Sequence, residues 1–236
     1  MKKKVLIVLG VIILIVVALI AYAVIDDLQQ EKKLIGELVE INELSNAETI
    51  DMDKINEHLN KTVTKGDYAV VEQAYKQYLK DSFDNSLEIA NLINDERIVT
   101  ILTAENYIED GPEFTETKAY IAETKQSLED CKNKYYEFFT DEKAMSYIND
   151  KNLDSYYIDF YKSDIAFDME LGAEDKTVEN AINDIIAILD DSEDVIDFLI
   201  ENANNWQIVE DSIVFNSDTL SQQYDELIQK MPIYQA

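Results

Sequence analysis

The sequence predicts a mainly α-helical chain, with an N-terminal transmembrane helix, an antiparallel helical bundle-like ectodomain and a small C-terminal β-hairpin. Three observations predict this class. The segment Val5–Ile25 carries no charged residue. Apolar residues recur at spacings of three and four over most of the remaining chain, which is typical of amphipathic helices. The 236 residues include only 5 Gly and 2 Pro, whereas all-β folds need many turns built from such residues.

The segment Val5–Ile25 has the length and composition of a membrane anchor. At ~1.5 Å per residue a helix of this length extends ~30 Å, the thickness of a bilayer's hydrocarbon core. Three lysines precede it directly and two aspartates follow it. Because the lysine-rich side of a span stays in the cytoplasm, we expect a cytoplasmic tail over residues 1–4. The chain from residue 26 onward is then extracytoplasmic, in a single-pass protein of the cell membrane.

A cleaved signal peptide is the alternative to a retained anchor. Ala21-Tyr22-Ala23 is a small-x-small triplet of the kind that signal peptidase accepts. Cleavage near Ala23 would release a secreted protein. The apolar run is longer than the ~7–15 residues of an ordinary signal-peptide core, and this length favours the retained anchor.

Residues 26–66 are predicted to form a helical stalk or linker. An apolar stripe runs over 26–44 at helical spacing, so this helix is either a stalk or the first helix of the bundle. Asp51 or Asp53 then caps a short helix that ends near Gly66.

Residues 67–236 are expected to form one extracytoplasmic helical domain. Asp67 caps its first long helix, and the Gly111-Pro112 pair joins two helices in an α-hairpin. The helices expected in this part are 67–93 with a further stripe to 109, 113–139, 142–148, 155–171, 176–189, 192–203 and 219–230.

A β-hairpin is predicted between residues 206 and 215. The period of the apolar residues changes there from 3.6 to two, which is typical of half-buried strands. Glu210-Asp211 stands where the two-residue turn belongs, although it lacks the favoured Asn-Gly sequence.

The charge of the chain restricts its partners. The formal net charge is −29, which disfavours nucleic acid and anionic lipid headgroups. Arg97 is the only arginine among the 20 basic residues. This preference for lysine, with abundant Ile, Asn and Asp, is typical of an AT-rich bacterial genome. Together with the anchor it indicates a protein of the bacterial cell envelope.

Common catalytic motifs are missing from the sequence. The 5 glycines are scattered, so no Gly-rich loop is available to hold a phosphate, and there is no G-x-S-x-G elbow. The single histidine, His58, excludes the usual zinc sets and leaves little acid–base capacity near pH 7. We therefore expect no catalytic residues and no organic cofactor.

His58 and Cys131 are the only conceivable thiol–imidazole pair, and they lie on separate predicted helices. His58 is expected to be an exposed polar residue. Cys131 has no second cysteine with which to form an internal disulfide, and it is expected to be a small, half-buried apolar residue. An intermolecular disulfide through Cys131 is the alternative.

A weak calcium candidate lies near the C-terminal end. Asp190, Ser192, Asp194 and Glu201 match positions 1, 3, 5 and 12 of an EF-hand loop. Val195 stands where that loop needs glycine for its sharp turn. A junction between two helices is therefore the favoured interpretation.

An aromatic cluster offers a candidate binding surface. Its members are Tyr156, Tyr157, Phe160, Tyr161 and Phe167, and aromatic platforms bind sugars and peptides. Most of these positions share one helical face, which favours a role in the core.

Three classes of function follow from these observations. The first is a membrane-anchored extracytoplasmic interaction or scaffold protein that holds a protein partner at the cell envelope. The second is a ligand-sensing or ligand-binding ectodomain that acts through a partner. The third is a hydrolase that uses paired carboxylates, which the 49 acidic residues make possible by chance alone.

Overall fold

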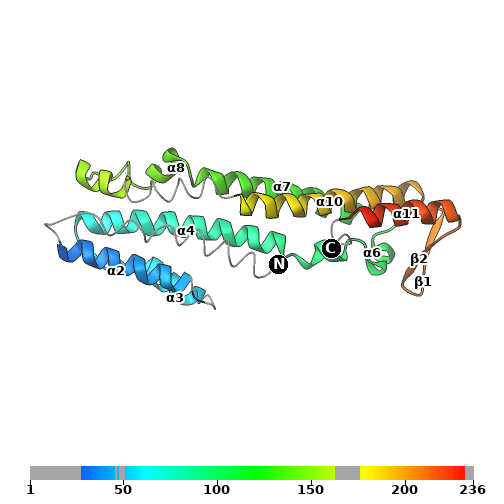
Figure 1. Cartoon of the computed structure of the whole chain (residues 1–236), viewed down its shortest axis with the longest axis horizontal. Coiled ribbons are helices and arrows are strands. Elements are labelled where there is room, and N and C mark those ends of the chain that lie inside the picture. Colours follow the sequence, from blue (N-terminus) through cyan, green and yellow to red (C-terminus); the bar gives the residue numbers. More distant parts are fainter. Residues whose placement is uncertain (1–27, 46, 48–50, 163–175, 232–236) are drawn as a thin grey trace. The chain divides into compact units, whose positions relative to one another are not determined.

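A computed structural model describes residues 28–45, 47, 51–162 and 176–231 (Figure 1). These residues are mainly helical and end in a small antiparallel β-hairpin followed by one helix, as the sequence predicts. The predicted anchor Val5–Ile25 lies outside the described residues. Among the helices that are described, none combines the length and the apolar character needed to cross a membrane.

The described elements follow the predicted order closely. They are α2 (Leu28–Ser45), α3 (Met52–Asn60), α4 (Asp67–Ile93), α5 (Glu96–Thr100), α6 (Ala104–Glu109), α7 (Thr115–Glu137), α8 (Asp141–Ser146), α10 (Thr177–Glu201), β1 (Trp206–Val209), β2 (Ser212–Phe215) and α11 (Asp218–Lys230). Residues 155–162 are also helical.

Side-chain caps fix where the short helices begin. The Asp51 carboxylate accepts a hydrogen bond from the Lys54 amide at the start of α3. Asp95, Thr103 and Thr140 accept equivalent bonds at the starts of α5, α6 and α8. Each cap satisfies an amide that has no partner inside the helix. Thr103 also explains why the predicted stripe up to residue 109 forms two short helices instead of one.

Helix α10 differs from the prediction of two helices separated at Asp190-Asp191. The structure shows one helix, Thr177–Glu201. The buried side chains of Leu189 and Val195 keep their helical register on both sides of the acidic residues. Ser192 is also buried, and its hydroxyl donates to the Ile188 carbonyl at 2.7 Å. This bond satisfies the hydroxyl within the helix, so Ser192 does not act as a cap.

The described residues form two compact units. Unit 1 contains the described residues up to Glu88 together with those of 133–178, and unit 2 contains those of 89–132 and 179–236. Helices α4 and α7 contribute residues to both units.

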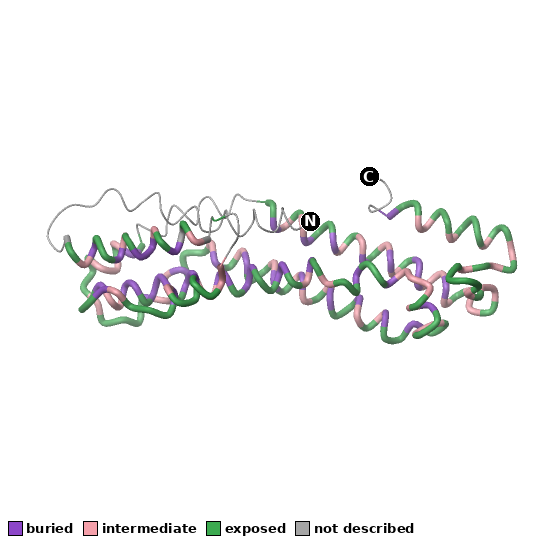
Figure 2. The backbone as a smooth tube through the Cα atoms, turned by 90° about the horizontal axis from the view of Figure 1, so that it is seen from below, coloured by how far each residue is buried: buried purple, intermediate pink, exposed green. Residues whose placement is uncertain are grey.

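Unit 1 has a core to which α2 contributes, as the alternative of a first bundle helix predicts. Leu34, Leu38 and Ile41 of α2 are buried in it, as is Ile55 of α3. Figure 2 shows buried positions recurring along the helices as stripes. The remaining buried members are Leu59, Tyr68, Val71, Ala74, Tyr75, Tyr78, Leu79, Phe83, Phe138, Ala144, Ile148 and Tyr161.

Unit 2 is built on an antiparallel pair, α7 and α10. Lys118 of α7 pairs with Asp197, whereas Lys125 pairs with Asp190 and Glu193, so the two helices run in opposite directions. The buried residues of this unit include Ile121, Leu128, Ile182, Ile185, Leu189, Ile196 and Leu199.

The β-hairpin of unit 2 confirms the predicted turn. Trp206 pairs with Phe215 and Val209 with Ser212, in antiparallel register. Glu210 and Asp211 have φ angles of 50° and 61°, and a two-residue turn that matches the twist of a hairpin needs positive φ at both positions.

Candidate functional site

A buried group of charges joins three helices of unit 1. Glu37 comes from α2, whereas Glu72 and Lys76 come from α4, one helical turn apart. Their side chains are 4%, 0% and 3% exposed. The Lys76 ammonium lies 2.7 Å from Glu72 Oε1 and 2.8 Å from Glu37 Oε1. Charges this deeply buried persist only when they are paired and hydrogen-bonded.

Lys76 is surrounded by oxygen atoms. Besides the two carboxylates, its Nζ donates to the carbonyls of His58 at 2.8 Å and Lys61 at 2.6 Å. An ammonium has three hydrogens, fewer than the four oxygens in reach. Lys76 thereby ties the end of α3 to α2 and α4.

Glu72 holds the segment between α3 and α4. Its carboxylate accepts hydrogen bonds from the amides of Val63 and Thr64 and from the Thr64 hydroxyl, at 2.6–3.0 Å. Burial alone would raise the pKa of Glu72. The bonds from Lys76, Thr64 and Val63 outweigh burial, so the pKa is lowered from its usual 4.5.

His58 borders this group of charges on the solvent side. Its Nδ1 lies 3.1 Å from Glu37 Oε1 and 3.6 Å from Glu40 Oε2, and its side chain is 20% exposed. The expectation that His58 is an exposed polar residue is therefore wrong. Glu37, Glu72 and Lys76, with His58 and Glu40 at the border, are called the polar junction below.

The second candidate feature is a solvent-open groove of about 440 Å³ in unit 1. Residues of α4, α7 and α8, with Phe138 just after α7, line it. They are Asp81, Asp84, Asn85, Glu88, Lys134, Glu137, Phe138 and Lys143.

The groove carries more negative than positive charge. Lys134 lies 3.6 Å from Glu88, and Lys143 stands over the ring of Phe138, 5.1 Å from its centroid. Within the described part of the chain, no ion pair reaches Asp84 or Glu137. The groove thus presents two carboxylates that have no ion-pair partner among the described residues, those of Asp84 and Glu137, together with the ring of Phe138.

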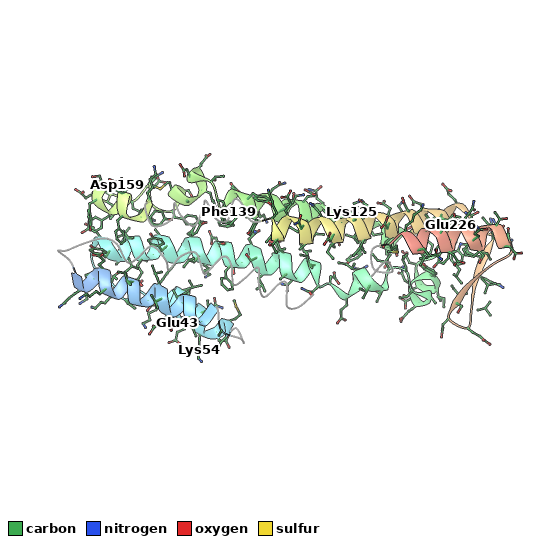
Figure 3. The ribbon with its side chains drawn as sticks, viewed as in Figure 1. Glu43, Lys54, Lys125, Phe139, Asp159 and Glu226 are labelled. Atoms are coloured by element: carbon green, nitrogen blue, oxygen red, sulfur yellow. The ribbon has the colours of Figure 1, made fainter. Side chains whose placement is uncertain are left out.

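The calcium candidate residues all lie on α10. Asp190, Ser192, Asp194 and Glu201 belong to one uninterrupted helix, so they do not line a loop of the EF-hand type. Asp190 pairs with Lys125 of α7. Figure 3 shows Lys125 where α7 runs alongside α10.

Asp191 shows the effect of crowding on this helix. Burial raises the pKa of Asp191 above its usual value, and the neighbouring charges of Asp194 and Asp190 raise it further. The acidic run of α10 therefore includes a carboxyl group that ionises less readily than an isolated aspartate.

The other predicted site residues are spread over both units. Cys131 is buried in unit 2, whereas His58 belongs to unit 1. Tyr161 is fully buried, and Tyr157 and Phe160 pack against the core of unit 1. Tyr156 is 52% exposed. Phe167 lies outside the described residues. Tyr157, Phe160 and Tyr161 follow the favoured core interpretation, whereas Tyr156 does not.

Sequence reasoning missed the polar junction, although α4 contains a signal for it. Glu72 and Lys76 fall between Tyr68, Tyr75 and Leu79 on the apolar face of the helix. A Glu–Lys pair at spacing four on the buried side of an amphipathic helix marks two charges that need partners inside the protein. The partner Glu37 is 39 residues from Lys76, and no local pattern indicates it.

Comparison of the chain with protein-family models, with curated proteins and with solved structures found no match.

Proposed function

We propose that this protein is an extracytoplasmic interaction module, held at the cell membrane by Val5–Ile25, that binds a basic segment of a partner protein in the groove of unit 1. The observation that carries the proposal is the groove itself, whose lining includes carboxylates from α4 and α7 together with Phe138. The proposal names a class of partner by its charge and shape.

The unpaired carboxylates of the groove determine the chemistry of the partner. Asp84 and Glu137 are exposed, so a cationic group reaches them with little loss of hydration. A Lys or Arg side chain of the partner supplies this charge, and its aliphatic stem covers apolar surface beside Phe138. The net charge of −29 draws such a basic partner toward the protein and speeds the encounter.

The remaining polar groups of unit 1 favour binding over catalysis. Glu72 and Lys76 are fully engaged in holding helices together. The aromatic residues of 155–162 face the core for the most part and do not line the groove. A ligand-sensing ectodomain whose pocket is formed by these aromatic residues is therefore the less supported function.

Site-specific crosslinking in the cell tests the proposal. A photo-reactive amino acid replaces Asp84 in the full-length chain, and in a second sample it replaces Asp159, which is exposed on the same unit (Figure 3). We expect illumination to give a discrete adduct with one envelope protein from position 84 and none from position 159.

Charge variants connect this adduct to the proposed chemistry. The double substitution Glu88→Gln and Glu137→Gln is expected to reduce the adduct from position 84 at least fivefold, whereas Glu142→Gln, an exposed acid on α8 that does not line the groove, leaves it unchanged. Equal labelling from positions 84 and 159, or labelling that is insensitive to groove charge, contradicts the proposal.

A further inference from the structure

Three potential metal ligands gather where α2 meets α3. One ligand atom from each of Glu37, Glu40 and His58 lies within 4.8 Å of the other two. We propose that these residues bind one divalent transition-metal ion of the zinc class. The His58 Nδ1 atom and one oxygen from each carboxylate are the ligands. This inference is independent of the groove and of any partner bound there.

The spacing of the three atoms suits a small ion. Zinc binds nitrogen and carboxylate oxygen at about 2.0–2.2 Å, so its tetrahedral ligands lie about 3.4 Å from one another. His58 Nδ1 is 3.1 Å from Glu37 Oε1 and 3.6 Å from Glu40 Oε2. Small rotations of the side chains are enough to close the site. Glu40 is 62% exposed, which gives the ion access and leaves the fourth position for water.

The charges of the polar junction also favour a divalent ion. Glu37, Glu40 and Glu72 oppose the single ammonium of Lys76. With a neutral imidazole, these four residues carry an excess of two negative charges. A bound divalent ion cancels this excess of negative charge. The excess is most destabilising in this part of unit 1, because the carboxylates of Glu37 and Glu72 are almost fully buried.

Lys76 supports the site and does not occupy it. It donates to Glu37 from the interior at 2.8 Å, as outer-shell residues do when they orient a ligating carboxylate. Each oxygen of Glu37 has two lone pairs, so the carboxylate can bind a metal ion while it accepts this bond. His58 must present the lone pair of Nδ1 to the ion, so its ring hydrogen resides on Nε2 in the bound state.

The ligand set selects the class of metal. Imidazole nitrogen suits zinc, copper and nickel, whereas calcium and magnesium prefer oxygen ligands alone. His58 is the only histidine of the chain. Any metal ion bound to imidazole in an untagged sample is therefore bound at this site, even though 49 acidic residues attract cations elsewhere.

Thermal unfolding with zinc provides the test. Untagged full-length chain in detergent micelles is titrated with Zn²⁺ by calorimetry and then heated with Zn²⁺ at about 100 times the measured Kd. We expect one ion per chain and a rise in Tm of about 5–10 °C. His58→Gln is expected to abolish the rise, and Glu40→Gln to weaken binding at least tenfold. Glu43→Gln is the matched control, because Glu43 is exposed on the same helix and outside the cluster (Figure 3).

A spectroscopic measurement keeps the test independent of stability. With one equivalent of Cu²⁺ in place of zinc, we expect an electron paramagnetic resonance spectrum that shows coupling to one imidazole nitrogen, and His58→Gln removes that coupling. Glu40→Gln leaves the Lys76–Glu37 pair intact, so the metal-free Tm of this variant checks that it folds. No rise in Tm, equal rises in all four proteins, or a copper spectrum without nitrogen coupling overturns the proposal.

Discussion

Lys76 illustrates how a single residue can hold several elements of this protein. It is almost completely buried, yet oxygens from α2, α3, α4 and the residue that follows α3 surround its ammonium. A methylene stem with a neutral end would fill the same space without satisfying those oxygens. We therefore expect the stability of unit 1 to depend on this charge more than on the apolar contacts of the side chain.

Replacement of Lys76 by methionine tests this dependence. Lys76→Met leaves Glu37 and Glu72 as buried carboxylates without a cation, so we expect a loss of about 3–5 kcal/mol in the free energy of unfolding. Urea unfolding followed by circular dichroism measures the loss. Lys80→Met, one turn further along α4 and less buried, is the control and should change stability by about 0.5 kcal/mol or less. A loss of similar size in both variants contradicts the role given to Lys76.

The ionisation of Glu72 makes the stability of unit 1 depend on pH. Although burial opposes its ionisation, the bonds from Lys76, Thr64 and Val63 prevail and its pKa in the folded chain is below 4.5. The unfolded chain therefore binds more protons between the two pKa values. The stabilisation is complete above about pH 4.5 and is lost as the pH falls through the folded-state pKa.

This dependence on pH predicts how much stability the parent chain and a Glu72 variant lose in acid. Urea unfolding at a series of pH values from about 5 to 3 should show a smaller decline in stability for Glu72→Gln than for the parent chain. Glu57→Gln, an exposed acid on α3, should decline like the parent. Parallel curves for the parent and Glu72→Gln would show that Glu72 contributes nothing to the acid response.

Replacement of Gly111 and of Gly36 by alanine is expected to change the free energy of unfolding in opposite directions. A Cβ atom at Gly111 would lie 2.4 Å from the Tyr107 carbonyl oxygen and 3.1 Å from the Trp206 ring, whereas a Cβ at Gly36 meets nothing within 4 Å. Gly111→Ala should therefore lower the free energy of unfolding by about 1–3 kcal/mol. Gly36→Ala, within helix α2, should raise it by about 0.5–1 kcal/mol. Chemical denaturation of both variants measures the difference, and a stabilised Gly111→Ala protein is incompatible with the observed packing.

At the scale of the elements, local rules explain most boundaries. The hydroxyls and carboxylates that cap α3, α5, α6 and α8 stand one residue before each helix, so sequence reasoning could locate most of these starts. It failed at Asp190-Asp191, where local charge suggested a break but burial of Leu189 and Val195 kept α10 continuous. Tertiary packing overrides propensity where an apolar stripe continues through a polar segment.

The β-hairpin gives a prediction at the same scale. Glu210 and Asp211 both adopt positive φ, a conformation that side chains other than Asn and Gly adopt at a cost. The double substitution Glu210→Asn and Asp211→Gly should raise the thermal stability of the chain by about 1 kcal/mol, as measured by the shift in Tm. The control is Glu210→Gln with Asp211→Ser, which removes the same two charges without supplying residues that favour positive φ, so it should not raise the Tm. A lower Tm for the Asn-Gly variant would mean that the acidic side chains stabilise the turn.

At the scale of the whole molecule, we propose that the N-terminal segment Val5–Ile25 holds the described units outside the cytoplasm. The proposed orientation rests on the three lysines that precede Val5. A reporter that is active only outside the cytoplasm, fused after Ala236, should be active, and a reporter that is active only in the cytoplasm should be silent. Replacing the three lysines by glutamine should lower the activity of the first reporter several-fold. Activity of the cytoplasmic reporter alone contradicts the proposed location and class of partner.

The sequence by itself determined most of the helices and the β-hairpin, because each depends on residues within a few positions of one another. The anchor Val5–Ile25 stays a prediction of the sequence. Capping, helical period and turn geometry are local properties, so they can be predicted from a single sequence. Only the tertiary structure decided that α2 joins the core, that two compact units form, and that Glu37, His58 and Lys76 meet. These outcomes depend on which distant side chains satisfy one another's charge and exclude water, and a charge on the surface and a charge in a buried pair look the same in a sequence.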